Sequence, residues 1–256
     1  MYLETCRNML KLLTLMLIVT FVSCQPMPGK EDALKQNQKG IDYMNEGKYD
    51  QAIQEFSAAV KNANLSNLSK GTIYRNIALA YNELGKKDSA IHFYTIAAKA
   101  YRKNSYDYIV NMANVDMLTG RVNTALVKLT KAAGVNPEDL SVNNMLGLIY
   151  LGDYGSEFTD YEKALLYNKK AFDISGGRIT EDILGRSYYE LKNFEMAEMH
   201  YENIHNQYPG EVVYTLNLAM TKYKLKKKSE ADVFFNKVMA QDSSYRETIA
   251  VFRNAN

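Results

Sequence analysis

Hydrophobic and small residues recur at helical spacing along most of the chain. In a typical segment, Ala52 is followed by an aromatic residue at Phe56 and by another apolar residue at Ala59. Residues spaced in this way lie on one face of a helix, so each such stripe predicts a helix with one buried face. The stripes are separated by turn signals, which are Gly47, Gly85, Gly120, Asn136-Pro137 and Tyr208-Pro209-Gly210. With only 4 Pro among 256 residues, the chain is predicted to be all-α.

The stripes fall into six units, which start near residues 33, 71, 106, 140, 178 and 212. Each unit predicts two helices, and each helix carries one small residue. The two small residues of a unit are 12 positions apart in five units and 17 apart in the fourth. Paired helices approach most closely where side chains are small, because a larger side chain would push them apart. The twelve positions are Gly40, Ala52, Ala78, Ala90, Ala113, Ala125, Gly147, Ala164, Gly185, Ala197, Ala219 and Ala231.

This arrangement resembles the tetratricopeptide repeat (TPR) over about residues 33–245. The resemblance implies a right-handed superhelical solenoid of about six helix-turn-helix repeats. An aromatic residue follows the small residue of several first helices, as in Ala78 and Tyr81, but Asp116 and Lys222 stand at that place in the third and sixth units. The apolar spacing over residues 245–256 predicts an amphipathic helix that caps the last repeat.

The resemblance also implies that the first helices line a concave groove for a peptide or a helix of another protein. Amide, methionine and aliphatic side chains suit such a ligand, although each could instead pack between repeats. The expected lining comprises Asn37, Ile41, Met44, Arg75, Leu79, Asn82, Asn114, Met117, Asn144, Leu148, Arg186, Tyr189, Met220 and Tyr223, together with Leu34, Val110, Leu151, Asp182 and Leu216. Its four asparagines form either a ladder for peptide amides or an ordinary solvated row. A five-residue insertion in the fourth unit places Tyr154 and Phe158 on an exposed turn, as tolerated variation or as a partner contact.

The first 23 residues follow a different pattern. The uncharged stretch from Leu12 to Val22 is too short to span the ~30 Å hydrocarbon core of a membrane, and two basic residues precede it. It predicts a secretory signal peptide over residues 1–23, with translation starting at Met1 or Met9.

The signal ends at Ser23-Cys24, which resembles a bacterial lipobox. The resemblance implies lipidation of Cys24 and an envelope protein, and the Pro-rich segment after it predicts a tether over residues 24–32. Together with the repeats, the chain resembles a TPR lipoprotein of a Bacteroidota-type bacterium. Because Gln25 is not Asp, the expected place is the outer membrane, more on its periplasmic face than on the cell surface. The alternative is a plain secretory signal with an incidental cysteine. Asp88-Ser89-Ala90 also resembles a short O-glycosylation signal.

The charge balance and the reactive residues argue against several classes of function. Without residues 1–23 the chain has 29 basic and 28 acidic side chains, which gives no electrostatic reason to expect nucleic acid. The three histidines, His92, His200 and His205, lack the spacing of a metal site, and no phosphate loop or nucleophile motif occurs. We therefore expect no metal, no cofactor, no small-molecule substrate and no catalysis. Two further groups are predicted to be solvated helix surfaces: Glu195, Glu198 and Glu202, and Lys224, Lys226, Lys227 and Lys228.

The sequence thus predicts a lipid-anchored, non-catalytic scaffold or adaptor of the bacterial envelope. Its partners would be other proteins, and the membrane through its anchor. The alternative is an assembly factor, pilotin-like or barrel-assembly-like, for an outer-membrane or secretion machine.

Overall fold

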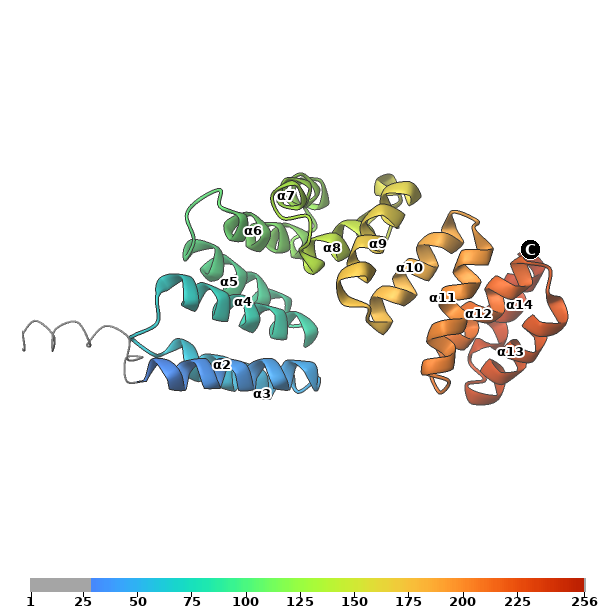
Figure 1. The fold of residues 1–256 in the computed structure, drawn as a ribbon, viewed down its shortest axis with the longest axis horizontal. Coiled ribbons are helices and arrows are strands. Elements are labelled where there is room, and N and C mark those ends of the chain that lie inside the picture. The colour runs from blue at the N-terminus through green and yellow to red at the C-terminus, as the bar shows by residue number, and fades with distance from the viewer. Residues whose placement is uncertain (1–28, 256) are drawn as a thin grey trace, which may run out of the picture. The chain divides into compact units, whose positions relative to one another are not determined.

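The computed structural model describes residues 29–255, and over this range the chain is helical without any strand (Figure 1). Thirteen α-helices and one short 3-10 helix make up this part of the chain. The predicted signal peptide, Cys24 and most of the tether lie outside the described residues. Within residues 29–255, no helix combines the length and the apolar character that a bilayer-spanning segment needs.

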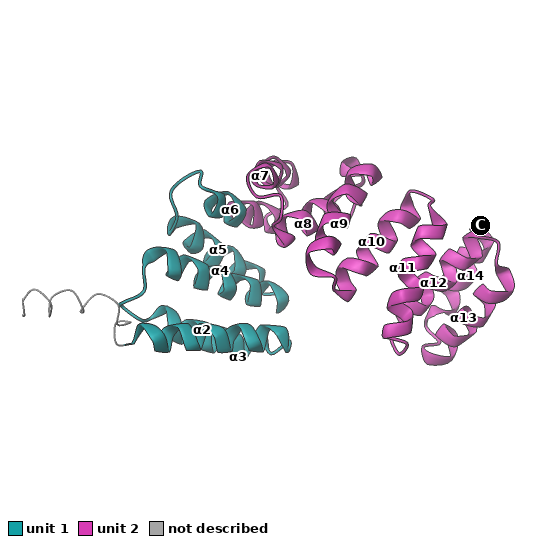
Figure 2. Cartoon of the chain, viewed as in Figure 1, with its two compact units in different colours: residues 1–111 teal, residues 112–256 magenta. Residues whose placement is uncertain are grey.

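The chain divides into two compact units, residues 1–111 and residues 112–256 (Figure 2). In the first unit, α2 (Lys30–Asn45) pairs with α3 (Tyr49–Val60), and α4 (Asn67–Glu83) pairs with α5 (Lys87–Lys99). The second helix of the first pair also packs on the first helix of the next. The helix α6 (Tyr106–Leu118) contains the boundary between the units.

The second unit continues this order of helix pairs. Each helix packs mainly on its neighbours along the chain, as expected of stacked helix-turn-helix repeats. Its elements are α7 (Val122–Val135), α8 (Leu140–Tyr150), η1 (Ser156–Phe158), α9 (Tyr161–Ser175), α10 (Arg178–Glu190), α11 (Phe194–Gln207), α12 (Val212–Lys224), α13 (Lys228–Gln241) and α14 (Tyr245–Ala255).

All twelve small residues of the repeat pattern are buried. A Cβ atom added at Gly40 would lie 2.5 Å from Cε1 of Phe56, and one added at Gly185 would lie 3.0 Å from Cε1 of Tyr201. The aromatic ring of the second helix therefore packs directly on the backbone of the first, as the sequence pattern requires. This packing confirms the predicted all-α fold of TPR-like helix pairs.

Local signals explain where several helices begin. The side chain of Ser66 accepts a hydrogen bond from the backbone N–H of Ser69 at 3.0 Å and caps α4, and Asp139 caps α8 in the same way. The first helices α6, α8, α10 and α12 begin at residues 106, 140, 178 and 212, whereas α2 and α4 begin at residues 30 and 67, ahead of the predicted unit starts.

The helix α14 follows the sixth helix pair and packs on it. Ile249 is buried in a cluster with Phe235 and Val238, and the Phe252 ring lies 5.5 Å from that of Tyr223. The helix therefore covers apolar side chains of α12 and α13, the role predicted for a capping helix.

Candidate functional site

The residues predicted to line a groove differ in exposure. Twelve of the fourteen main candidates are half-buried, whereas Asn82 is exposed and Asn114 is buried. The four asparagines therefore do not present equivalent amides, and the side-chain oxygen of Asn37 already accepts a hydrogen bond from Asn76 at 3.4 Å.

Several candidates pack against the repeat cores. Ile41 and Met44 lie against the core of the first two helix pairs, as does Tyr223 against that of the last pair. Three further candidates, Val110, Leu151 and Leu216, are themselves buried, which corrects the expectation that they line a groove. At these positions the demand for apolar packing between repeats decides the residue type.

Four predicted groove residues come together at one cavity of about 190 Å³ in the second unit. They are Asp182, Arg186 and Tyr189 of α10 and Met220 of α12. The remaining lining comprises Glu190, Tyr201 and Asn217. The cavity therefore draws on three successive helices, α10, α11 and α12.

Helical spacing explains the wall that α10 contributes. Asp182, Arg186 and Tyr189 are four and three residues apart, which places them on one face of the helix. The ring of Tyr201 reaches the cavity from α11 because Gly185 has no side chain at the point where this ring crosses α10.

Polar contacts hold the cavity walls in place. The Asn217 side-chain N–H donates to Oδ1 of Asp182 at 3.0 Å, which connects α12 to α10. The guanidinium of Arg186 donates two hydrogen bonds to the carboxylate of Asp153, at 3.0 Å and 2.5 Å. This parallel geometry is the strongest form of an arginine–carboxylate pair and orients the arginine.

Burial changes the acidity of the groups around the cavity. It raises the pKa of the Asp182 carboxyl, against the opposing effects of the hydrogen bond from Asn217 and the charge of Arg186. Burial also raises the pKa of Tyr189 to about 12 and the pKa of Tyr201 well above its ordinary value. Both phenols are therefore neutral at physiological pH and able to donate hydrogen bonds.

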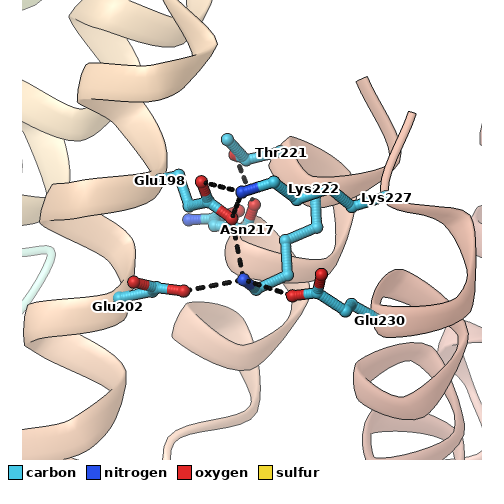
Figure 3. Close-up of polar contacts among 7 residues, drawn as sticks. All are labelled: Glu198, Glu202, Asn217, Thr221, Lys222, Lys227 and Glu230. Atoms are coloured by element: carbon cyan, nitrogen blue, oxygen red, sulfur yellow. Dashed lines mark hydrogen bonds and ion pairs between the residues drawn. The ribbon is translucent and has the colours of Figure 1, made fainter. Parts of the chain in front are cut away.

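An ionic cluster centred on the buried Lys222 shares α11 and α12 with the cavity and extends to α13 (Figure 3). Nζ of Lys222, on α12, lies 2.7 Å from Glu198 and 2.6 Å from Glu202 of α11, and 3.0 Å from Glu230 of α13. Lys227 adds a second cation, 2.6 Å from Glu198. The cluster connects three helices through charge.

This cluster corrects the prediction that Glu198 lies on a solvated surface. The side chain of Glu198 is only 12% exposed and is paired with Lys227. The other predicted surface residues Glu195, Glu202, Lys226, Lys227 and Lys228 are exposed. Although burial alone would raise the pKa of Glu198, the hydrogen bonds from Lys222 and Lys227 hold it below its ordinary value. Likewise, the bonds from three glutamates raise the pKa of Lys222, although burial opposes them. The cluster is thus charged and structural.

The histidines pack among other side chains. The buried ring of His200 stacks on Tyr188 and meets Phe172 edge-on, with Nδ1 3.5 Å from Oε1 of Glu181. His205 shares a hydrogen bond of 3.1 Å with the hydroxyl of Thr215. In the part of the chain that the structure describes, no three His, Cys, Asp or Glu side chains are grouped so that they could hold a metal ion.

The insertion of the fourth unit folds back towards the turn that precedes α7. Tyr154 and Phe158 line a polar cleft of about 350 Å³ together with Arg121 and Asn123. The predicted exposure is confirmed for Tyr154, whereas Phe158 is half-buried, and the sequence did not predict the turn that the insertion faces.

Paired helices with buried small residues, stacked on their neighbours, define a TPR-type helical-repeat protein. The chain belongs to the bacterial family described as "Uncharacterized protein conserved in bacteria (DUF2225)", whose model matches residues 29–254. No curated protein matches the chain.

Solved structures show the same fold. The APC/C hetero-tetramer Cut9–Hcn1 superposes with a TM-score of 0.67 at 18% identity, over 88% of this chain and 43% of that chain. A crystal structure of MamA protein gives a TM-score of 0.51 at 19% identity, over 69% of this chain and 94% of that chain. A second MamA structure, from MSR-1, gives 0.54 at 17% identity, over 68% of this chain and 98% of that chain. At these identities the similarity concerns the fold.

Proposed function

We propose that the protein is a non-catalytic adaptor that holds a peptide or helical segment of other proteins against the first helices of its repeats. The observation that carries this function is the cavity between α10, α11 and α12, where Arg186, Tyr189 and Met220 meet. Its walls combine fixed polar groups with apolar and aromatic surface, a combination suited to a peptide side chain. The similar fold of Cut9, which is part of a hetero-tetramer with Hcn1, agrees with a role in holding other proteins.

The proposed location is the bacterial envelope, with the chain anchored through lipid on Cys24 at the outer membrane and facing the periplasm. The support is the sequence of the first 24 residues, in which an apolar core ends at Ser23-Cys24. More than one acyl chain on this cysteine would hold the protein stably on a bilayer, whereas a single chain is marginal.

Photocrosslinking in intact cells tests the adaptor function. The crosslinking amino acid p-benzoylphenylalanine replaces Tyr189, a conservative aromatic exchange inside the cavity. The matched control replaces Val251 of α14, which is 62% exposed and does not line the cavity. We expect protein partners that crosslink through position 189 and not through position 251.

The crosslinked partners also distinguish an adaptor from an assembly factor. Several partners in varying amounts support an adaptor, whereas one stable complex of fixed composition supports an assembly factor for an envelope machine. Identical crosslinks at both positions, or none at position 189, would contradict binding at the cavity.

The anchor has its own test. Labelling with a radioactive fatty acid should mark the wild-type protein and should disappear in Cys24→Ala. Label that persists in this variant would exclude Cys24 as the site. Protease added to intact cells then distinguishes a periplasmic protein, which is protected, from a surface-exposed one.

A further inference from the structure

The cavity between α10, α11 and α12 is acidic. Three carboxylates, those of Asp153, Asp182 and Glu190, surround the single guanidinium of Arg186. Both guanidinium hydrogen bonds of Arg186 are made with Asp153, so the charges of these two side chains largely neutralise each other. The charge of Arg186 also acts on Asp182 and Glu190, but neither of its two hydrogen bonds goes to them, so both carboxylates can still accept hydrogen bonds from a ligand.

The two remaining acids sit in different surroundings. Asp182 is half-buried and accepts one hydrogen bond, from a neutral amide. The hydroxyl of Tyr161, also a neutral group, is near Glu190, whose charge raises the pKa of this phenol. A partly desolvated carboxylate with only neutral donors is stabilised by a cation that brings N–H groups.

The rest of the lining suits an aliphatic chain. Met220 offers a flexible thioether, and Tyr189 and Tyr201 offer aromatic rings. Such walls accept the methylene stem of a long basic side chain while its charged head stays near polar groups. The volume of about 190 Å³ corresponds to about six water molecules, which is comparable to one lysine or arginine side chain.

Building on the peptide-binding function above, we propose that this cavity takes a lysine or arginine side chain of the partner, whose cationic head pairs with Asp182 and Glu190. The aliphatic stem lies along Met220 and the tyrosine rings. The selectivity is opposite to that of a groove that clamps a carboxylate with basic residues. An acidic ligand would meet two carboxylates and a guanidinium whose hydrogen bonds are already made with Asp153, so it is repelled.

A defined peptide set tests this selectivity. The probes are fluorescein-labelled, C-amidated alanine–glycine peptides that differ at one central residue, which is lysine, arginine, norleucine or glutamate. Norleucine keeps the aliphatic stem and removes the charge. Binding of these probes to the full mature chain is measured by fluorescence anisotropy, for the wild type and for Asp182→Asn and Glu190→Gln. The control is Glu195→Gln, which removes one exposed carboxylate of α11 outside the cavity.

We expect the lysine and arginine probes to bind the wild type at least about tenfold more tightly than the norleucine probe, as one charge-assisted contact allows. Each cavity variant should lose most of this preference while binding of the norleucine probe stays the same. Glu195→Gln should behave as the wild type. Should Asp182→Asn fail to fold, as circular dichroism would show, the partly exposed Glu190→Gln carries the comparison alone.

The outcomes distinguish a failure of the basic-residue pocket from a failure of the adaptor function. Probes that bind without a preference for a basic residue, or a preference that survives both variants, overturn the basic-residue pocket and leave peptide binding in place. The absence of binding by every probe, together with the absence of crosslinks at position 189, overturns the adaptor function and the pocket with it. Crosslinked partners without binding of any probe overturn the pocket only.

Discussion

Asp116 and Lys222 occupy the same position of two different repeats, three residues after the small residue of the first helix, and both bury a charge there. Other repeats carry a tyrosine at this position, for example Tyr81. Asp116 is paired with Arg121 at 2.6 Å and with Lys128, whereas Lys222 is paired with three glutamates. Opposite charges thus replace the same aromatic ring in two repeats, and each is neutralised by residues on adjoining segments.

Removing the charge of Lys222 should destabilise the protein. In Lys222→Met the side-chain volume is kept, but the largely buried carboxylate of Glu198 loses one of its two cationic partners. We expect the free energy of unfolding to fall by about 3 kcal/mol, measured by urea denaturation. The exposed Lys131→Met on α7 is the control and should change stability by less than about 0.5 kcal/mol. Equal effects of the two substitutions would show that the cluster does not stabilise the fold.

The close contact at Gly40 should leave no room for an added methyl group. In Gly40→Ala the new Cβ would lie 2.5 Å from the buried ring of Phe56, so the helix pair must separate. We expect a loss of about 1 to 3 kcal/mol in the free energy of unfolding. The matched control is Gly134→Ala in α7, where no atom lies within 4 Å of the new Cβ. There the higher helix propensity of alanine should add about 0.5 to 1 kcal/mol. A loss in both variants would point to a general effect of the substitution.

A glycine should stabilise the turn that contains Lys192. This residue has φ 61°, in the left-handed region, at the turn position where earlier repeats have Gly47, Gly85 and Gly120. Lys192→Gly relieves a conformational cost of about 1 to 2 kcal/mol and adds a smaller entropy to the unfolded chain. We therefore expect a net gain of about 0.5 to 1 kcal/mol in thermal or urea unfolding. The reciprocal variant Gly85→Lys should lose a similar amount, since a Cβ there meets no atom within 4 Å and only the backbone cost remains.

The carboxylate of Asp182 should lower the free energy of unfolding at neutral pH. Its pKa is higher in the folded chain because the carboxyl is desolvated, so the folded state binds its proton more tightly than the unfolded state. Folding therefore carries a penalty at pH 7, which decreases as the pH falls through the raised pKa and vanishes below the ordinary value of 3.8. The charged and titratable groups that face it are Arg186, Glu190, Tyr189, Tyr201 and Tyr214. Arg186 stays charged and the three phenols stay neutral over this pH range, because the pKa of each is raised.

Asp182→Asn should accordingly be more stable than the wild type at pH 7, and the difference should disappear in acid. Urea denaturation of both proteins as a function of pH measures this, with Glu195→Gln as the control for the loss of an exposed carboxylate. Lower stability of Asp182→Asn at pH 7 would mean that the contacts with Asn217 and Arg186 outweigh desolvation. Higher stability of Asp182→Asn at pH 7 would be expected of a residue whose carboxylate serves binding at the expense of stability.

Local spacing was enough to predict the repeat architecture. The small residues at equivalent positions, such as Gly185 and Ala197, mark points of helix contact that depend only on residues within one unit. The aromatic residue four positions after the second small residue was a weaker guide. In the fourth repeat Asn168 stands there, packs against Gly147 and donates to the hydroxyl of Ser187 at 2.8 Å. A buried amide–hydroxyl pair of this kind has no signature in hydrophobic periodicity.

The ionic cluster and the cavity could be predicted only in part. Glu198 and Lys222 are 24 residues apart, and an exposed helix surface has the same mixture of Lys and Glu. One available signal was that Lys222 replaces an aromatic residue at a buried position of the repeat. For the cavity, the common face of Arg186 and Tyr189 was predictable, whereas the contributions of Tyr201 and Asn217 depend on how successive helices align.

The helix α12 is held on several sides at once, and this affects how a partner would be captured. Asn217 connects it to α10, and Lys222 connects it to α11 and α13. A wall fixed in this way is in place before any ligand arrives, so little conformational entropy of the protein is lost on binding. The flexibility of the incoming segment would then set most of the entropic cost, and a pre-ordered partner would bind more tightly than a disordered one of the same sequence.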